Sequence, residues 1–239
     1  FSSQKENLFC IDEIQRKPDL FPLIRSLSDE WNENGKFLIL GSASRDLLQQ
    51  SSESLAGRIS YIRLTPFLWN EIKQDFSLDQ YMEKGGFPRS ILAENQEISF
   101  QWREDFISTF LERDLLQWAG IRPATMQRLW QMLAWNNGQT VNHSRLGNSL
   151  GVSNVTIANY IDLLSETFML EIIPPYIKNT KKRLVKSPKV YISDSGITSA
   201  LLQLSSKEQI MGHPASGAIW EQLVYSNLKG YYPSSNIYF

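Results

Sequence analysis

The chain has 239 residues, a formal net charge of −1 at pH 7 and a hydrophobic fraction of 42%, which allow one large domain or two of medium size. The near-neutral charge gives no global electrostatic reason to expect nucleic acid or an anionic membrane as a partner. One cysteine and two histidines exclude an internal disulfide and a structural zinc site. No apolar run is long enough to cross a membrane and no signal-peptide pattern opens the chain, so we expect a cytoplasmic protein without membrane contact.

The first predicted strand is the apolar run from Leu8 to Ile11, which contains Cys10 and is followed at once by Asp12 and Glu13. Four consecutive apolar residues are typical of a strand buried on both faces, as in the centre of a parallel sheet. The two acids then emerge at the carboxyl end of the strand, the edge at which open α/β sheets bind ligands. In a nucleotide hydrolase, one acid at this place holds Mg²⁺ and the next orients or deprotonates the attacking water. A merely solvated acid at a strand end is the alternative.

A crossover helix and a second strand follow. Pro18 begins the helix and Asn34-Gly35 is a typical end for it. Its apolar residues recur at helical spacing: Leu20, Leu23, Ile24, Leu27 and Trp31. The second apolar run, Phe37 to Leu40, leads into the polar stretch Gly41 to Arg45. The right-handed crossover rule predicts two parallel strands whose polar ends share one edge of the sheet.

Several short motifs, in the right order over nearly the whole chain, resemble those of one protein family. The motifs are Leu8 to Gln15, Leu38 to Ser44, Ser54 to Arg58, Gly85-Gly86-Phe87-Pro88, Leu111 to Asp114, Lys186 to Tyr191 and Asp194-Ser195-Gly196. The family is that of the prokaryotic AAA-type P-loop ATPases of the archaeal-ATPase-like branch, which carry a conserved C-terminal domain of unknown function. The resemblance implies an α/β parallel-sheet P-loop NTPase part that binds ATP with Mg²⁺.

The resemblance also implies roles for individual residues. Asp12 would hold Mg²⁺ and Glu13 would act on the attacking water, while Ser42 or Ser44 would sense the γ-phosphate. Arg58 would supply charge to the γ-phosphate, in cis or from a neighbouring subunit of a homo-oligomer. An arginine that pairs with a local acid is the alternative for Arg58.

One expected element is missing from the sequence. No G-x-x-x-x-G-K-[ST] loop, whose backbone amides and lysine hold the phosphates, occurs anywhere in the chain. In the family this loop precedes the Asp-Glu strand, so we expect the sequence to be a piece of a longer protein and expect this piece alone not to hydrolyse ATP. A natural protein that lost the loop is the alternative. Residues 1–75 would be the C-terminal portion of the ATPase domain, with a further strand from Ile59 to Leu64 and a short helix from Thr65 to Ile72.

Residues 76–239 are predicted to form a mainly α-helical domain. A helix from Trp102 to Trp118 carries an aromatic and aliphatic stripe, and its other, solvated face is expected to hold the charged residues Arg103, Glu104, Glu112, Arg113 and Asp114. A functional role for Glu112 to Asp114 is the alternative. A second helix, Met126 to Trp135, would pack against the stripe. The aromatic and methionine stripes are interpreted as core and not as a cofactor site.

A winged helix-turn-helix is predicted from Thr140 to Ile173. Ser144 opens its first helix, Gly151-Val152 makes the turn and Ser153 caps the second helix, which is followed by a strand. The residues expected on the outside of the second helix include no cation: Asn154, Thr156, Ala158, Asn159, Asp162 and Glu166. A packing module is therefore favoured over a module that reads bases.

A basic segment follows the predicted strand. Its cations, with no acid among them, are Lys178, Lys181, Lys182, Arg183, Lys186 and Lys189. It is a candidate for non-specific contact with a DNA backbone, and an exposed loop whose lysines maintain solubility is the alternative.

The C-terminal part is predicted to contain a strand, Val190 to Ile192, and helices from Ile197 to Leu202 and from Ala215 to Leu228. Asp194 matches a residue that is typical of the family, but no mechanism can be assigned to it. The segment around Glu221 resembles the start of a restriction-endonuclease-like region, whose further residues this chain does not contain. Three classes of function remain open: an AAA-type ATPase, a winged-helix DNA-binding regulator, and a nucleotide-dependent interaction switch that hydrolyses slowly. The protein partner and the biological process are not indicated.

Overall fold

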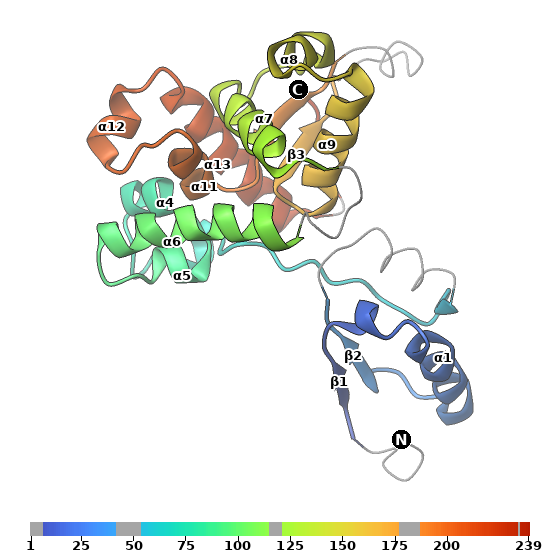
Figure 1. Ribbon diagram of the computed structural model, residues 1–239. Coiled ribbons are helices and arrows are strands. Elements are labelled where there is room, and N and C mark those ends of the chain that lie inside the picture. Colours follow the sequence, from blue (N-terminus) through green and yellow to red (C-terminus); the bar gives the residue numbers. More distant parts are fainter. Residues whose placement is uncertain (1–6, 42–53, 115–120, 177–186, 234) are drawn as a thin grey trace. The chain divides into compact units, whose positions relative to one another are not determined.

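A computed structural model describes residues 7–41, 54–114, 121–176, 187–233 and 235–239 (Figure 1). Contacts between residues divide the chain into two compact units, Phe1–Leu64 and Thr65–Phe239. Unit 1 contains strand β1 (Phe9–Ile11), the 3₁₀ turn η2 (Ile14–Arg16), helix α1 (Leu20–Trp31) and strand β2 (Phe37–Ile39).

The two strands of unit 1 pair in parallel, with Phe9 opposite Phe37 and Ile11 opposite Ile39. This confirms the predicted strand-helix-strand unit. Side chains from alternate positions of both strands pack on α1, and the indole of Trp31 stacks on Phe37 with ring centroids 5.4 Å apart. The helix ends at Asn32, whose left-handed backbone (φ 50°) forms the C-cap, two residues before the expected Asn34-Gly35 end.

Two expectations for unit 1 are wrong. Cys10 and Leu38, which lie opposite each other on the two strands, are exposed, although the apolar pattern predicts burial on both faces. The reason is that α1 covers one face of a sheet that has two strands among the described residues. Residues 59–64 do not form the expected strand, and Ile62 and Leu64 are 82% and 88% exposed.

Unit 2 is mostly helical. Its elements are α3 (Trp69–Ile72), α4 (Leu78–Lys84), α5 (Pro88–Ile91), α6 (Gln96–Thr109), the π-helical turn η3 (Phe110–Asp114), α7 (Pro123–Trp135), α8 (His143–Leu150), α9 (Asn154–Glu166), β3 (Leu170–Ile173), β4 (Lys189–Ile192), α11 (Ser195–Leu201), α12 (Lys207–Gly212) and α13 (Ser216–Tyr231). Strands β3 and β4 pair antiparallel, with Leu170 opposite Ile192.

The centre of unit 2 is α11, in which all seven residues are buried. This helix contacts α4, α6, α7 and α13 (Figure 1). A continuous apolar core surrounds it, and its largest fully buried apolar members include Trp130, Leu133 and Ile157. Small residues such as Gly196 and Ala200 give α11 a narrow cross-section, which lets four neighbouring helices approach it closely.

Helices α8 and α9 form the predicted pair of helices joined by a turn. Gly151 has a left-handed backbone (φ 67°) at the end of α8, and the Ser153 hydroxyl accepts a hydrogen bond of 3.1 Å from the Thr156 N–H at the start of α9. The inner face of α9 is buried as expected, including Ile157 and Leu164. Helix α9 contacts β3, so the helix pair and the two-stranded sheet belong to one packed substructure.

The expectation for the charged face of α6 is wrong at Arg103, which is fully buried. Its Nε and Nη1 atoms donate to the backbone carbonyls of Ser99, Glu83 and Gly196 at 2.7–3.1 Å, and these bonds replace part of those that the guanidinium would make with water. The expected helix from Trp102 to Trp118 is observed as α6 up to Thr109 and as the π-helical turn up to Asp114, and its last four residues lie outside the described ones.

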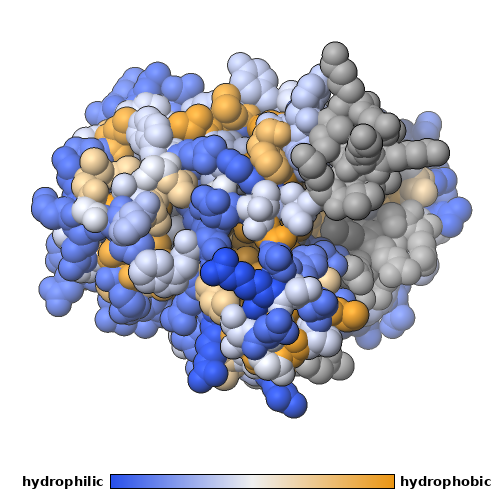
Figure 2. Space-filling view, turned by 90° about the horizontal axis from the view of Figure 1, so that it is seen from above, coloured by the Kyte–Doolittle hydropathy of each residue, from blue (hydrophilic) through white to orange (hydrophobic). Residues whose placement is uncertain are grey.

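The surface is mixed in character. On the face drawn in Figure 2, hydrophobic residues are interspersed among hydrophilic ones. Among the described residues, no helix combines the length and the apolar character that crossing a membrane requires. In the same part of the chain, no cluster of three or more His, Cys, Asp or Glu residues is placed to hold a metal ion.

Candidate functional site

Asp12 and Glu13 lie directly after β1 and are both exposed. The Asp12 Oδ1 atom accepts a hydrogen bond of 2.9 Å from the backbone N–H of Glu13. Glu13 has a left-handed backbone (φ 51°), a conformation that costs a non-glycine residue about 1–2 kcal/mol. Such conformations gather at functional sites, where the surrounding structure holds them.

The end of β2 lies beside these acids. The backbone N–H of Leu40 donates to the Ile11 carbonyl at 2.8 Å, so the chain leaves β2 at the edge of the sheet where Asp12 begins. Ser42 and Ser44, the predicted sensors of the γ-phosphate, follow this point and lie outside the described residues. The ends of β1 and β2 therefore lie side by side, but the positions of the Ser42 and Ser44 hydroxyl groups are not described.

Arg58 ends a tight turn in unit 1. Gly57 adopts a left-handed backbone (φ 76°), and Leu55 is buried against the apolar cluster beneath α1. The Arg58 Nε atom makes an ion pair with the Asp29 carboxylate on α1, and Nη1 donates to the Ala56 carbonyl at 3.1 Å. In this arrangement a local acid, Asp29, holds the guanidinium, which is the alternative considered for Arg58.

The basic segment is mostly outside the described residues, which end at Tyr176 and resume at residue 187. Five of its predicted DNA-contacting cations therefore have no described position: Lys178, Lys181, Lys182, Arg183 and Lys186. Lys189 is described, and its ammonium pairs with Glu221 at 3.4 Å and lies 5.4 Å from the Phe239 ring centroid. Lys189 and Glu221 thus stabilise the neighbourhood of β4 and α13.

The charged triplet at the end of α6 lies in the π-helical turn. Glu112 is exposed and accepts a hydrogen bond of 3.3 Å from the Ser108 hydroxyl. The structure does not describe the side chains of Arg113 and Asp114. Nothing at Glu112 indicates chemistry beyond this local contact.

Asp194 has the function of a buried anchor. Its carboxylate caps α11 by accepting from the Ile197 N–H at 3.0 Å, and it also accepts from the Gly86 N–H at 2.7 Å. Burial raises the pKa of Asp194, whereas the backbone N–H donors and the Arg103 guanidinium act in the opposite direction. Burial lowers the pKa of Arg103 to about 10. This value is still well above neutral pH, so the guanidinium stays charged.

Three glycines allow this anchor to form. A Cβ atom on Gly85, which has φ 74°, would lie 2.1 Å from Asp194 Oδ1, and one on Gly196 would lie 2.2 Å from the Lys84 carbonyl oxygen. A Cβ atom on Gly86 would lie 2.4 Å from the Phe67 carbonyl oxygen. The glycine motif and the Asp-Ser-Gly motif are therefore two sides of one close backbone contact. The sequence did contain a signal for the capping role, because an aspartate directly before an apolar helical run is a helix N-terminus pattern.

A second buried polar group was not predicted. The Gln222 Oε1 atom accepts from Asn137 Nδ2 at 2.7 Å and from the Thr198 hydroxyl at 2.9 Å, and Asn137 Oδ1 accepts from the Ile192 N–H at 2.9 Å. This network joins α13, α11, the end of α7 and β4. It is a packing feature of unit 2, and no sequence pattern identifies partners so far apart in the chain.

Comparison with protein families divides the chain in a similar way. An AAA domain family matches residues 1–73, and the domain of unknown function DUF8612 matches residues 75–208, which is more than half of the chain. The chain belongs to the DUF8612 family. The two matches together give an AAA-like part followed by a C-terminal domain of unknown function, as the resemblance implied.

Three similar proteins are all uncharacterized. One from Mycobacterium tuberculosis is 39% identical over 234 residues, covering 97% of this chain and 53% of the relative. One from Haemophilus influenzae is 27% identical over 82% of this chain and 52% of its own length, and one from Methanocaldococcus jannaschii is 22% identical over 98% and 56%. The chain thus spans about half the length of the curated relatives it matches. No solved structure matches the chain.

Proposed function

We propose that this chain is part of an AAA-type ATPase that binds ATP with Mg²⁺. The observation that carries the proposal is the parallel pairing of β1 and β2, which brings Asp12 and Glu13 to the same sheet edge as the end of β2. The AAA family match to residues 1–73 supports it independently. Residues 1–75 would belong to the ATPase part and residues 76–239 to the helical domain.

The donor set at this edge fits Mg²⁺. Mg²⁺ prefers oxygen ligands and is commonly held by one or two carboxylates together with water and substrate phosphates. Asp12 would supply the carboxylate, Glu13 would accept the proton of the attacking water, and Ser42 or Ser44 would contact the γ-phosphate. When bound, Mg²⁺ would neutralise charge that develops on the phosphates. After leaving Asp29, Arg58 would contact the γ-phosphate of a nucleotide bound to the same subunit or to a neighbouring subunit. The second case requires a homo-oligomer, which is therefore part of this proposal.

Glu13→Gln tests the proposal in a form of the protein with the length of its relatives. Nucleotide binding should persist while the rate of ATP hydrolysis falls roughly 10²-fold, because the amide keeps the shape of the side chain but cannot accept the proton. Asp12→Ala should instead weaken the binding of Mg²⁺-ATP. Phosphate release and the binding of a fluorescent nucleotide measure the two effects.

Glu30→Gln, at an exposed carboxylate on α1, is the matched control and should change neither rate nor affinity. If both strand-end variants hydrolyse ATP at the parental rate, Asp12 and Glu13 are solvated acids and the ATPase proposal fails. Nucleotide binding with turnover that is slow and insensitive to Glu13 would instead support an interaction switch.

We also propose that α7, α8, α9, β3 and β4 form a winged helix that serves mainly as a packing module. The contacts of α8 with α9 and of α9 with β3 support this arrangement. The exposed side of α9 presents Asn154, Val155, Asn159 and Asp162, none of which is a cation. Base reading by this helix is therefore disfavoured, and any DNA contact would come from the basic segment that precedes β4.

Reversal of Lys181, Lys182 and Arg183 to glutamate tests the DNA contact. Binding should be weak and independent of sequence, and the triple variant should abolish it on every duplex. Each lost phosphate contact should reduce the slope of log affinity against log salt by about 0.9. Asn159→Ala is the control and should change little. Sequence-selective binding that depends on Asn159, measured by fluorescence anisotropy at several salt concentrations, would support the regulator hypothesis instead.

A further inference from the structure

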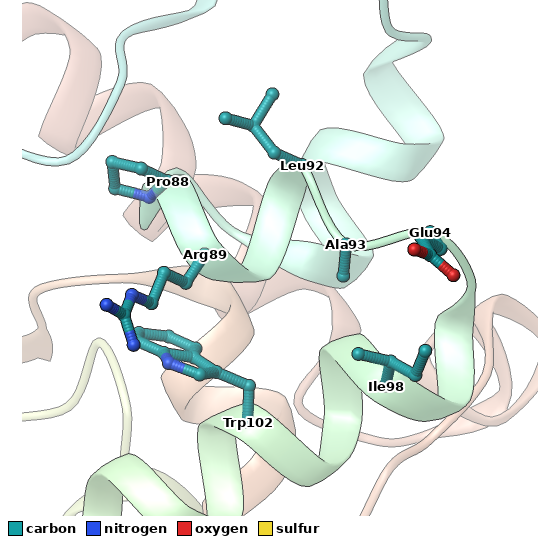
Figure 3. A pocket seen from close by; sticks show the side chains of 7 residues that line it. All are labelled: Pro88, Arg89, Leu92, Ala93, Glu94, Ile98 and Trp102. Atoms are coloured by element: carbon teal, nitrogen blue, oxygen red, sulfur yellow. The ribbon is translucent and has the colours of Figure 1, made fainter.

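A groove of about 420 Å³ lies between α5 and α6 in unit 2 (Figure 3). Pro88 and Arg89 of α5 and Ile98 and Trp102 of α6 line it, together with residues 92–94 of the connecting turn. The groove lies on the outer side of the helical pair whose inner side carries the buried Arg103. Its residues belong to unit 2, whereas the ATPase proposal uses residues of unit 1.

The lining of the groove is mainly apolar and open to solvent. Leu92 is 60% exposed and Ile98 is 48% exposed, and the indole of Trp102 lies beside them in the same groove. A small molecule is held by burying most of its surface in a concave site, which an open groove does not provide. A segment of another protein can cover such a groove, as when the apolar face of a helix packs into a hydrophobic groove.

The charges at the two ends of the groove have no internal function. Arg89 and Glu94 are exposed, and neither makes a hydrogen bond or an ion pair with any residue in the described part of the chain. Figure 3 shows Arg89 next to the indole of Trp102 on one side of the groove, with Glu94 and Ile98 on the other side. By contrast, Lys84 below the groove is buried and donates to the Ala93 carbonyl at 3.1 Å.

Residues 85–89, the glycine motif and the arginine that follows it, have two different kinds of role. Gly85 and Gly86 are required for the close contact with Asp194 and with the backbone at Phe67, and Pro88 begins α5. Arg89, the next residue, makes no hydrogen bond or ion pair with another described residue, and its guanidinium lies beside Trp102 in the groove (Figure 3). A free guanidinium beside an aromatic ring and aliphatic side chains matches a ligand that presents a carboxylate next to a large apolar group.

We propose that this groove binds a short peptide segment of a partner protein. The segment places a large apolar side chain against Trp102, Ile98 and Leu92, an acidic side chain on Arg89 and a basic side chain near Glu94. The charges at the two ends fix the direction in which the segment lies. The DUF8612 domain would thereby act as a protein-interaction module, independently of whether the ATPase proposal holds.

A random peptide library displayed on phage, selected on the 239-residue chain, tests the proposal. The selected peptides should share an acidic residue next to a large apolar residue, and Arg89→Ala should weaken the synthetic versions about tenfold, the effect of losing one charge-assisted contact. Leu92→Asp should abolish binding. Arg128→Ala, at an exposed arginine on α7, is the matched control and should change nothing.

A double-mutant cycle then assigns the contact. Replacing the acidic residue of a selected peptide by its amide should weaken binding to the parental chain, but not to Arg89→Ala, if the two groups touch. Circular dichroism should show that each variant is folded. Selection of no peptide, or of peptides that bind Arg89→Ala and Leu92→Asp as tightly as the parental chain, would overturn the proposal.

Discussion

Asp194→Ala should lower the free energy of unfolding of unit 2 by about 4 kcal/mol. The substitution removes the cap of α11 and leaves the N–H groups of Gly86 and Ile197 buried without an acceptor, and each unpaired group costs about 1–3 kcal/mol. It also removes the nearby negative charge that compensates the buried Arg103. Two unpaired donors at this cost amount to about 4 kcal/mol, and this loss outweighs any gain from desolvating one carboxylate less.

Urea unfolding followed by tryptophan fluorescence measures the effect. Asp194→Asn should fall between the alanine variant and the parental chain, because the amide oxygen can still cap α11 but carries no charge. Asp162→Ala, at an exposed aspartate on α9, should change the unfolding free energy by less than about 0.5 kcal/mol. A loss below about 1 kcal/mol for Asp194→Ala would show that the anchor does not contribute to stability.

Gly196→Ala should destabilise unit 2 by about 3 kcal/mol although it lies in a helix. Alanine is normally better than glycine inside a helix by about 1 kcal/mol. Here the new Cβ atom would lie 2.2 Å from the Lys84 carbonyl oxygen and 2.9 Å from the Gly85 nitrogen, and both are backbone atoms that cannot rotate away. Overpacking of this kind costs about 1–3 kcal/mol or more, so the clash outweighs the helical preference.

Gly217→Ala on α13 is the matched control. A methyl group added at Gly217 would meet no neighbouring atom within 4 Å, so only the helical preference remains, and we expect a gain of up to about 1 kcal/mol. The two substitutions are chemically identical and should have opposite signs in thermal or urea unfolding. If both stabilise the protein, the approach of α11 to α4 is looser than the structure describes.

The local order of elements could be predicted from the sequence because apolar periodicity reports it directly. The parallel β1–β2 pair and the helices α7, α8 and α9 were expected near their observed bounds. The exposure of Cys10 could not be predicted in the same way. A short apolar run has the same pattern whether one or both faces of its strand are covered, and the covering elements are set by the rest of the sheet.

Arg103 shows a different limit of periodicity. A charged residue opposite an aromatic stripe is normally solvated, and the pattern alone cannot identify the carbonyl groups of Glu83 and Gly196 that receive its hydrogen bonds. The same holds for Asp29, which lies 29 residues before its partner Arg58. At the candidate site, the strand ends at Asp12 were predictable from topology, whereas pairings across the fold were not.

The anchor at Asp194 also has a consequence for the order in which the protein forms on the ribosome. Gly86 and Asp194 are 108 residues apart in the chain. At a synthesis rate of about 5–20 residues per second, α4 waits roughly 5–20 s for α11, the helix it packs on. During that interval the apolar sides of α4 and α6 lack the central partner that later buries them. The nascent chain is therefore most vulnerable to aggregation after α6 has emerged and before α11 has, and a chaperone that binds apolar segments would act in this window.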